Sequence, residues 1–105
     1  MSVQQDVEKN IGLSRELLRQ IVDAIVRHVN PMRIIIYGSR ARGDYTVTSD
    51  IDIAMERDNG KEFFRCVIDD EVRTLLKLDI VDLNEVNEKV RDEIEREGLL
   101  IYEKA

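Results

Sequence analysis

The residues best suited to chemistry in this chain are two aspartates, Asp50 and Asp52, that follow a glycine-serine turn at Gly38-Ser39. In an extended strand the side chains of residues i and i+2 leave the same face, so these carboxylates point together. Their Cα atoms then lie roughly 7 Å apart, taking about 3.3 Å of rise per residue. Carboxylates at this spacing can hold one or two Mg²⁺ ions, with water or phosphate oxygens in the remaining positions. The pattern predicts a site for a metal and a nucleoside triphosphate.

A third carboxylate is usual in two-metal phosphoryl chemistry, and Asp79 is the candidate for it. It lies in the apolar run Leu78-Asp79-Ile80-Val81-Asp82, where a buried polar side chain without a partner is costly. A metal shared with the first two aspartates supplies such a partner. Asp82 is the alternative, but it falls near the end of the expected strand and faces the other way.

The acidic pair has a simpler interpretation as well. Alternating acid and isoleucine residues are typical of a half-exposed edge strand whose carboxylates are only solvated. We favour that interpretation for Asp50-Ile51-Asp52 taken alone. The glycine-serine turn upstream reverses the preference, because the two signals occur together with only a loop between them.

The turn itself is not a P-loop. Gly38 and Gly43 have the P-loop spacing, but Asp44 and Tyr45 stand where that motif needs Lys and Ser or Thr. Backbone amides around Gly38 and the Ser39 hydroxyl remain candidates for binding a terminal phosphate. Gly43 allows the loop to turn where a side chain would obstruct it.

Two arginines, Arg40 and Arg42, form the densest basic pair near this site. They either bind phosphates or are surface charges, and the sequence leaves both roles open. Ser49 directly precedes the acidic pair. The candidate nucleotide- and phosphate-binding residues are therefore Gly38, Ser39, Arg40, Arg42, Gly43 and Ser49.

The size and charge of the chain limit its class. At 105 residues it is expected to be a single domain over residues 1–105. A net charge of −6 argues against a protein that coats nucleic acid or an anionic membrane, and it favours a partner with a basic surface. We find no long apolar run, and the first residues are polar and acidic, so neither a membrane span nor a signal peptide is expected. The single cysteine, Cys66, is expected to be a buried structural thiol, and the predicted location is cytoplasmic.

Apolar periodicity predicts an α/β (α+β) fold with a small mixed β-sheet of three to four strands flanked by helices. The first helix is expected to be capped by Ser14 or Asn10, and the last by Asn84. The expected elements are a helix over 13–29, a strand over 33–37, a helical turn over 40–43, a strand over 50–55, a helix over 63–76, a strand over 78–83, a helix over 84–97 and an edge strand or packed tail over 99–102.

The motif Gly38-Ser39-x-Ala41-x-Gly43 followed by Ser49-Asp50-x-Asp52 resembles the signature of the DNA polymerase beta-like nucleotidyltransferase superfamily. More narrowly, the chain resembles the minimal nucleotidyltransferase (MNT) family. The resemblance covers nearly the whole chain, including the closing segment Glu97-Gly98-Leu99-Leu100-Ile101-Tyr102. It implies the polymerase beta-like nucleotidyltransferase fold.

The resemblance also implies roles for individual residues. Gly38 and Ser39 would hold the triphosphate, and Asp50 and Asp52 would bind Mg²⁺. Asp79 would complete the metal site and help to activate the acceptor hydroxyl. The family reaction would transfer a nucleoside monophosphate, most simply AMP from ATP or another NTP, and release pyrophosphate.

Small members of this family are commonly paired with a HEPN protein in toxin–antitoxin systems. The resemblance therefore implies an antitoxin that adenylylates a HEPN ribonuclease on a hydroxyl or masks it by binding alone. A third possibility is a small-molecule nucleotidyltransferase, for example one acting on an aminoglycoside. No second wall for an acceptor is evident in the sequence, so a partner chain or a second copy in a homo-oligomer is expected to complete the cleft.

Overall fold

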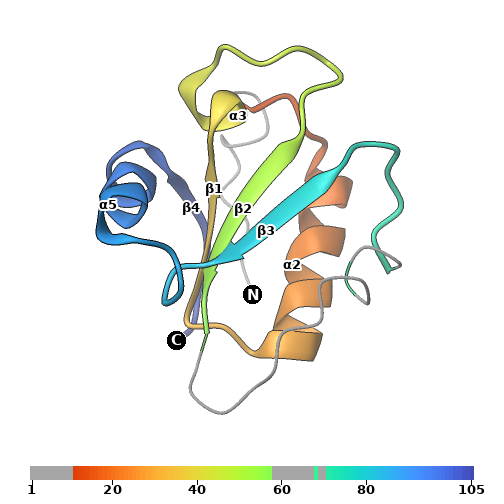
Figure 1. Cartoon of the computed structure of the whole chain (residues 1–105). Helices are drawn as coiled ribbons and strands as arrows, with labels where there is room; N and C mark the ends of the chain where they lie inside the picture. Colours follow the sequence, from red (N-terminus) through yellow and green to blue (C-terminus); the bar gives the residue numbers. More distant parts are fainter. Residues whose placement is uncertain (1–10, 58–67, 69–70) are drawn as a thin grey trace.

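The described residues form a four-stranded mixed sheet that packs against helices (Figure 1). The computed structural model describes residues 11–57, 68 and 71–105. Its elements are α2 (Arg15–Val29), β1 (Arg33–Tyr37), α3 (Ser39–Arg42), β2 (Ile51–Glu56), β3 (Leu78–Asp82), α5 (Glu88–Glu97) and β4 (Leu99–Glu103). The strand order is β3-β2-β1-β4, with β1 antiparallel to both of its neighbours and β2 parallel to β3. The predicted fold class is confirmed.

Caps at both ends define α2. The Ser14 hydroxyl accepts a hydrogen bond from the Leu17 amide at 3.1 Å, which satisfies one of the amides left open at a helix start. Asn30 ends the helix in the left-handed conformation, and its amide donates to the Val26 carbonyl. Of the two expected caps, Ser14 is the one observed, and Asn10 lies outside the described residues.

One face of the sheet is covered by α2. Ile34 and Ile36 of β1 and Ile51 and Ile53 of β2 are completely buried in one cluster with the inner side of this helix. Each such side chain contributes roughly 1.5–3 kcal/mol relative to exposure. Side chains alternate along a strand, so Asp52, between the two β2 isoleucines, faces away from α2.

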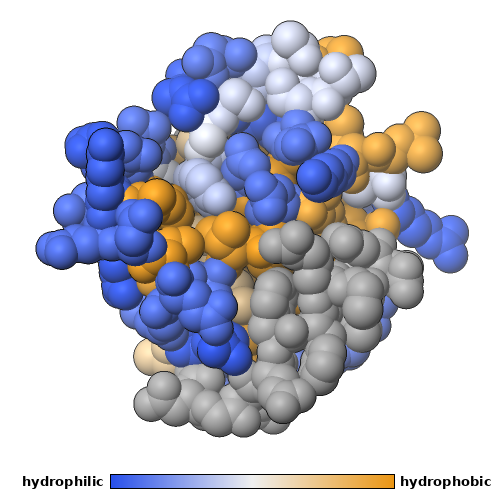
Figure 2. Space-filling model, viewed as in Figure 1, coloured by the Kyte–Doolittle hydropathy of each residue, from blue (hydrophilic) through white to orange (hydrophobic). Residues whose placement is uncertain are grey.

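The other face carries a smaller apolar cluster formed by Ile35, Ala54, Leu83 and Ile94, the last of these from α5. Figure 2 shows hydrophilic side chains over α5 and an apolar strip between this helix and the middle of the sheet. Hydrophilic side chains also gather where β2 and β3 begin. Polar side chains of this face thus include a group at the end of the sheet where β2 and β3 begin.

The predicted helix over 63–76 extends too far. Residues 63–67, including Cys66, lie outside the described residues, while Ile68 and Glu71 are helical. From residue 72 onward the chain has left the helix.

Local hydrogen bonds explain this early end. The Thr74 hydroxyl accepts from the Leu76 amide at 3.1 Å, which competes with a continued helix. Leu75 was expected on an apolar helix face, and instead it is fully exposed. The Lys77 carbonyl accepts from the Ile51 amide at 2.9 Å. The segment is thus drawn out to lead into β3 alongside β2.

The last helix begins later than predicted because a different asparagine caps it. The Asn87 side chain accepts from the Val90 amide at 2.9 Å. The Asn84 amide donates instead to Asp82 Oδ1 at 2.9 Å, within a turn. The predicted end at Gly98 is confirmed, and the residues that follow form the edge strand β4.

None of the helices in the described ranges combines the length and apolarity needed to cross a membrane.

Candidate active site

β1 ends at the same end of the sheet at which β2 and β3 begin (Figure 1). Two aspartates, one on β2 and one on β3, lie side by side at this end. Asp52 and Asp79 are register partners on the neighbouring parallel strands, whose backbones lie about 4.8 Å apart. On the other side of Asp52, its partner is Tyr37, the last residue of β1. Asp50 stands in the connecting segment directly before β2. Strand pairing therefore places the third candidate carboxylate, Asp79, beside Asp52, with Asp50 two residues earlier in the chain.

The glycine turn is packed directly against one of these carboxylates. Gly38 has φ 75° and ψ −151°, a conformation that is essentially restricted to glycine. A Cβ atom added here would lie 3.0 Å from Asp52 Cγ and still closer to Oδ2. Gly43 closes α3 with φ 92°, and its amide donates to the Ser39 carbonyl at 2.9 Å. The turn thus brings the backbone of residues 38 and 39 against the acidic strand.

The electrostatics show that the carboxylates interact. Burial raises the pKa of Asp52 above its usual range, and the negative charges of Asp79 and Asp50 raise it further. The nearby guanidinium of Arg42 acts in the opposite direction and lowers the pKa. A partly buried group of like charges is an arrangement that a bound cation stabilises.

The donor chemistry at this edge fits Mg²⁺. The three side chains offer only carboxylate oxygens, which are hard ligands with the charge that this ion requires. Within the part of the chain that the structure describes, no three Asp, Glu, His or Cys side chains are already drawn together as a metal-binding group. The residue types and their electrostatics therefore support the metal, and the side chains must converge further to hold it.

Comparisons with known proteins identify the fold. The family model described as "Polymerase beta, Nucleotidyltransferase" matches residues 19–105. The chain belongs to this nucleotidyltransferase family. The resemblance identified from the Gly38–Asp52 motifs is thereby confirmed, while a search of the curated proteins gives no match.

Two solved structures share the nucleotidyltransferase fold. One is a toxin-antitoxin crystal structure with AMP-PNP, at 20% identity and a TM-score of 0.69, covering 83% of this chain and 73% of that chain. The other is a Sulfolobus solfataricus protein with a provisional nucleotidyltransferase assignment, at 24% identity and a TM-score of 0.59. This second match covers 99% of this chain and 93% of that one.

In this nucleotidyltransferase domain, Arg40 is not a surface charge. Its side chain is 1% exposed. Its guanidinium donates to the carbonyl oxygens of Ile11 at 2.8 Å and Ser49 at 3.0 Å, and it lies 4.9 Å from the Tyr45 ring centroid. These contacts are those of a cation that holds backbone segments together. We therefore assign Arg40 a structural role rather than a phosphate-binding one.

The other two polar candidates differ in their surroundings. The Ser49 hydroxyl accepts from the Thr46 amide at 2.8 Å, so it braces the loop before β2. Arg42 is 47% exposed, with Asp44 at 3.4 Å and Glu97 at 3.7 Å. Arg42 also acts electrostatically on Asp52. Of the two arginines, Arg42 is the exposed one and acts electrostatically on Asp52.

Asp82, the alternative third carboxylate, is held elsewhere. Its side chain is 3% exposed, and its Oδ2 accepts from Arg57 Nε at 2.5 Å. It pairs in register with Met55, three positions along the strands from the Asp52–Asp79 pair. The structure therefore places Asp82 in an ion pair with Arg57 and leaves Asp79 as the aspartate of β3 that lies beside Asp52.

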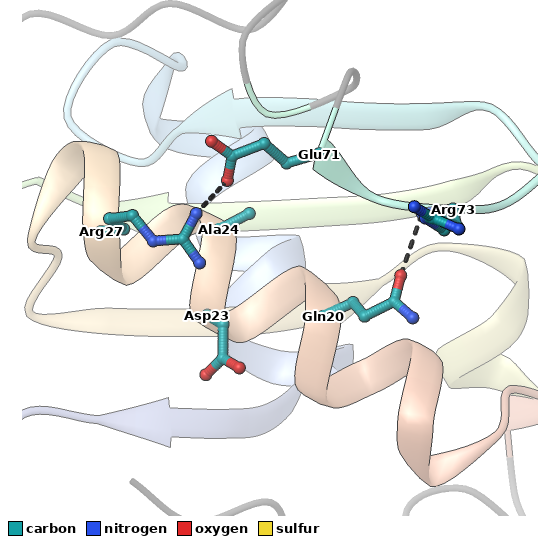
Figure 3. A pocket seen from close by; sticks show the side chains of 6 residues that line it. All are labelled: Gln20, Asp23, Ala24, Arg27, Glu71 and Arg73. Atoms are coloured by element: carbon teal, nitrogen blue, oxygen red, sulfur yellow. Dashed lines mark hydrogen bonds and ion pairs between the residues drawn. The ribbon is translucent and has the colours of Figure 1, made fainter.

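A surface hollow of about 350 Å³ lies on the α2 side of the molecule (Figure 3). It is lined by Gln20, Asp23, Ala24, Arg27, Glu71 and Arg73. Two interactions bridge it: Arg27 with Glu71 at 2.5 Å, and the Arg73 amide with the Gln20 side chain at 2.9 Å. Asp52 faces away from α2, so this hollow belongs to the opposite side of the sheet from the carboxylates.

Proposed function

We propose that this chain is a Mg²⁺-dependent nucleotidyltransferase that transfers AMP from ATP to a hydroxyl group of a protein partner. Membership of the nucleotidyltransferase family supports the reaction class. The observation that carries the assignment of the site is the register pairing of Asp52 with Asp79 beside the Gly38 turn. A nucleotide as substrate implies action in the cytoplasm.

In this proposal, different residues would bind the metal and the triphosphate. Asp50, Asp52 and Asp79 would hold Mg²⁺, which when bound neutralises phosphate charge and activates the attacking oxygen. The amides of Gly38 and Ser39 would bind the triphosphate, with Arg42 as a cation at the edge of the site.

The reaction then balances as a simple displacement. The acceptor hydroxyl oxygen bonds to the α-phosphorus while the bond between the α- and β-phosphates breaks, and pyrophosphate leaves. The hydroxyl proton passes to a carboxylate, for which Asp79 is the candidate. Catalysis consists of placing these groups in line and stabilising the developing charge.

The partner we propose is a toxin of the HEPN type, with this chain as its antitoxin. The structural relative solved as a toxin-antitoxin with AMP-PNP supports this context. The net charge of −6 suits contact with a basic, RNA-binding surface on the partner. Such a partner, or a second copy of this chain, would complete the acceptor side of the cleft.

The test is transfer of label from ATP to the co-purified partner in the presence of Mg²⁺. Label should reach the partner with the native chain and disappear when Asp50→Ala is combined with Asp52→Ala. A matched control removes the same charge from the exposed side of α5, through Asp92→Ala with Glu93→Ala, and should leave transfer intact.

Two other outcomes would contradict the enzymatic proposal. One is label that never reaches the partner, and the other is label that persists in the Asp50→Ala, Asp52→Ala variant. If that variant still neutralises the toxin in cells, masking by binding alone becomes the better explanation of the antitoxin role.

A further inference from the structure

Arg40 is the most deeply buried charged side chain in the described part of the chain, at 1% exposure. Removing a cation from water costs several kcal/mol unless its donors are satisfied. The guanidinium has five N–H donors, and within the described residues the hydrogen bonds that they make all go to backbone carbonyls. Because its hydrogen bonds go to backbone carbonyls, the side chain holds particular backbone segments in place.

Two separate segments are joined by this one side chain. Arg40 Nη1 donates to the carbonyls of Ile11 at 2.8 Å and Gly12 at 3.4 Å. Nη2 and Nε reach the loop before β2, with acceptors at the carbonyls of Thr46, Val47 and Ser49 between 3.0 and 3.4 Å.

The hydrogen bonds to the Ser49 carbonyl affect the position of the next residue, Asp50. This carbonyl belongs to the peptide unit that joins Ser49 to Asp50, and a peptide unit is planar. Two donors of Arg40, Nε at 3.3 Å and Nη2 at 3.0 Å, hold this oxygen. They therefore fix the orientation of this plane, which contains the Cα atom of Asp50. Arg40 itself lies one residue after Ser39 in α3.

Tyr45 closes the arrangement from outside. The guanidinium carbon of Arg40 lies 4.9 Å from the ring centroid, within the range of a cation–π contact. The same ring packs on Gly12, where an added Cβ atom would lie 2.5–2.8 Å from its atoms. The loop is thus held between the ring, the guanidinium and the backbone of residues 11 and 12.

We propose that Arg40 is a positioning residue that fixes Asp50 against the Gly38-Ser39 turn, so that the metal-binding and phosphate-binding halves of the site keep one geometry. The inference rests on the proposed function because it takes Asp50 as a ligand of the metal. It differs from both roles that the sequence leaves open for Arg40, a direct phosphate contact and a surface charge.

The variants are chosen to separate positioning from stability. Arg40→Met keeps the apolar stem and removes every donor, while Arg40→Lys keeps the charge without the guanidinium fork. Arg33→Met is the matched control, since Arg33 is a partly buried arginine at the far end of β1, bonded to Glu56 at 2.8 Å and Glu95 at 2.9 Å.

Two measurements decide the inference. In the ligand-free chain, the ¹⁵N shift of Asp50 and the carbonyl ¹³C shift of Ser49 should change in Arg40→Met and not in Arg33→Met. In binding experiments with Mg²⁺ and AMP-PNP, Arg40→Met should bind about 10- to 100-fold more weakly, as expected for loss of a residue that orients a ligand side chain. Arg40→Lys should fall between it and the native chain.

Other results would overturn the inference. These are native affinity in a folded Arg40→Met or Arg40→Lys chain, or an equal loss in Arg33→Met. If Arg40→Met does not fold, Arg40→Lys and Tyr45→Leu decide by the same two measurements. A native chain that does not bind Mg²⁺ and AMP-PNP contradicts the proposed function instead, and the Asp50 and Ser49 shifts then decide the positioning role alone.

Discussion

Asp52 of β2 and Asp79 of β3 are register partners on adjacent parallel strands and lie side by side in the sheet. Each follows an aliphatic residue buried against α2, Ile51 in one strand and Leu78 in the other. Strand alternation then sends both carboxylates to the opposite face. The hydrophobic core of the α2 side therefore determines where the two negative charges meet.

The proximity of these carboxylates predicts that the free energy of unfolding depends on pH. The pKa of Asp52 is raised by burial and by the other two aspartates. As pH rises from acid, the unfolded chain releases this proton first while the folded protein still holds it. The native chain should therefore lose stability relative to Asp52→Asn across the interval from the ordinary aspartate pKa to the raised one.

The measurement is urea unfolding of both proteins from acid to neutral pH. The two should be closest in stability in acid, and Asp52→Asn should gain relative to the native chain until the difference levels off. A difference between them that stays constant over this range would contradict the prediction.

The two aspartates of β3 should behave in opposite ways. Asp82→Asn weakens the contacts with Arg57 and with the Asn84 amide, and should cost about 2–3 kcal/mol of unfolding free energy, as for buried bonds to a charged group. Its affinity for Mg²⁺ and AMP-PNP should remain native. Asp79→Asn should lose that affinity while the protein stays folded. Calorimetric binding and urea unfolding of both variants check this prediction. Loss of binding in Asp82→Asn alone would mean that Asp82, and not Asp79, is the metal ligand.

Much of the fold followed from local pattern. The aliphatic runs of β1, β2 and β3 are short and bounded by turn residues, so the predicted strand boundaries agree with the structure to within one position. The predicted helix over 63–76 failed in its last part because Leu75 repeats the apolar spacing without being buried. Periodicity reports which residues are apolar, and it does not report whether a partner surface exists for them.

The candidate site likewise contains a residue whose position could be predicted from the sequence and one whose role could not. An acid inside an apolar strand needs a partner, so the sequence predicts that Asp79 lies beside Asp50 and Asp52. The role of Arg40 was not predicted, because its acceptors are backbone carbonyls from two distant segments. Carbonyls are present at every residue, so they leave no signature in a sequence. The only available signal is Tyr45, the one aromatic residue in the loop between α3 and β2.

Metal and nucleotide together should stabilise the fold. A ligand that binds only the folded chain adds about 2.7 kcal/mol of unfolding free energy at a hundred times its Kd. Thermal unfolding with Mg²⁺ and AMP-PNP should show this gain at neutral pH. The gain should shrink as pH falls toward the raised pKa of Asp52, because the proton then competes with the cation. A chelator, or Asp50→Ala with Asp52→Ala, should abolish it, and a gain that survives either treatment would place the ligand elsewhere.

Gly38→Ala should damage the site through two separable effects. The backbone at φ 75° and ψ −151° strains any residue with a Cβ atom, at a cost of about 1–3 kcal/mol. The new methyl group would also overlap the Asp52 carboxylate, with 3.0 Å to Cγ.

A double-mutant cycle distinguishes these effects, because strain is independent of residue 52 while overlap requires its side chain. In an Asp52→Ala background, Gly38→Ala should keep only the strain. Its unfolding cost, measured in urea, should therefore be smaller there than in the native background. Equal costs in the two backgrounds would mean that the turn and the carboxylate are not in contact, and would remove the structural link between the phosphate-binding and metal-binding halves of the proposed site.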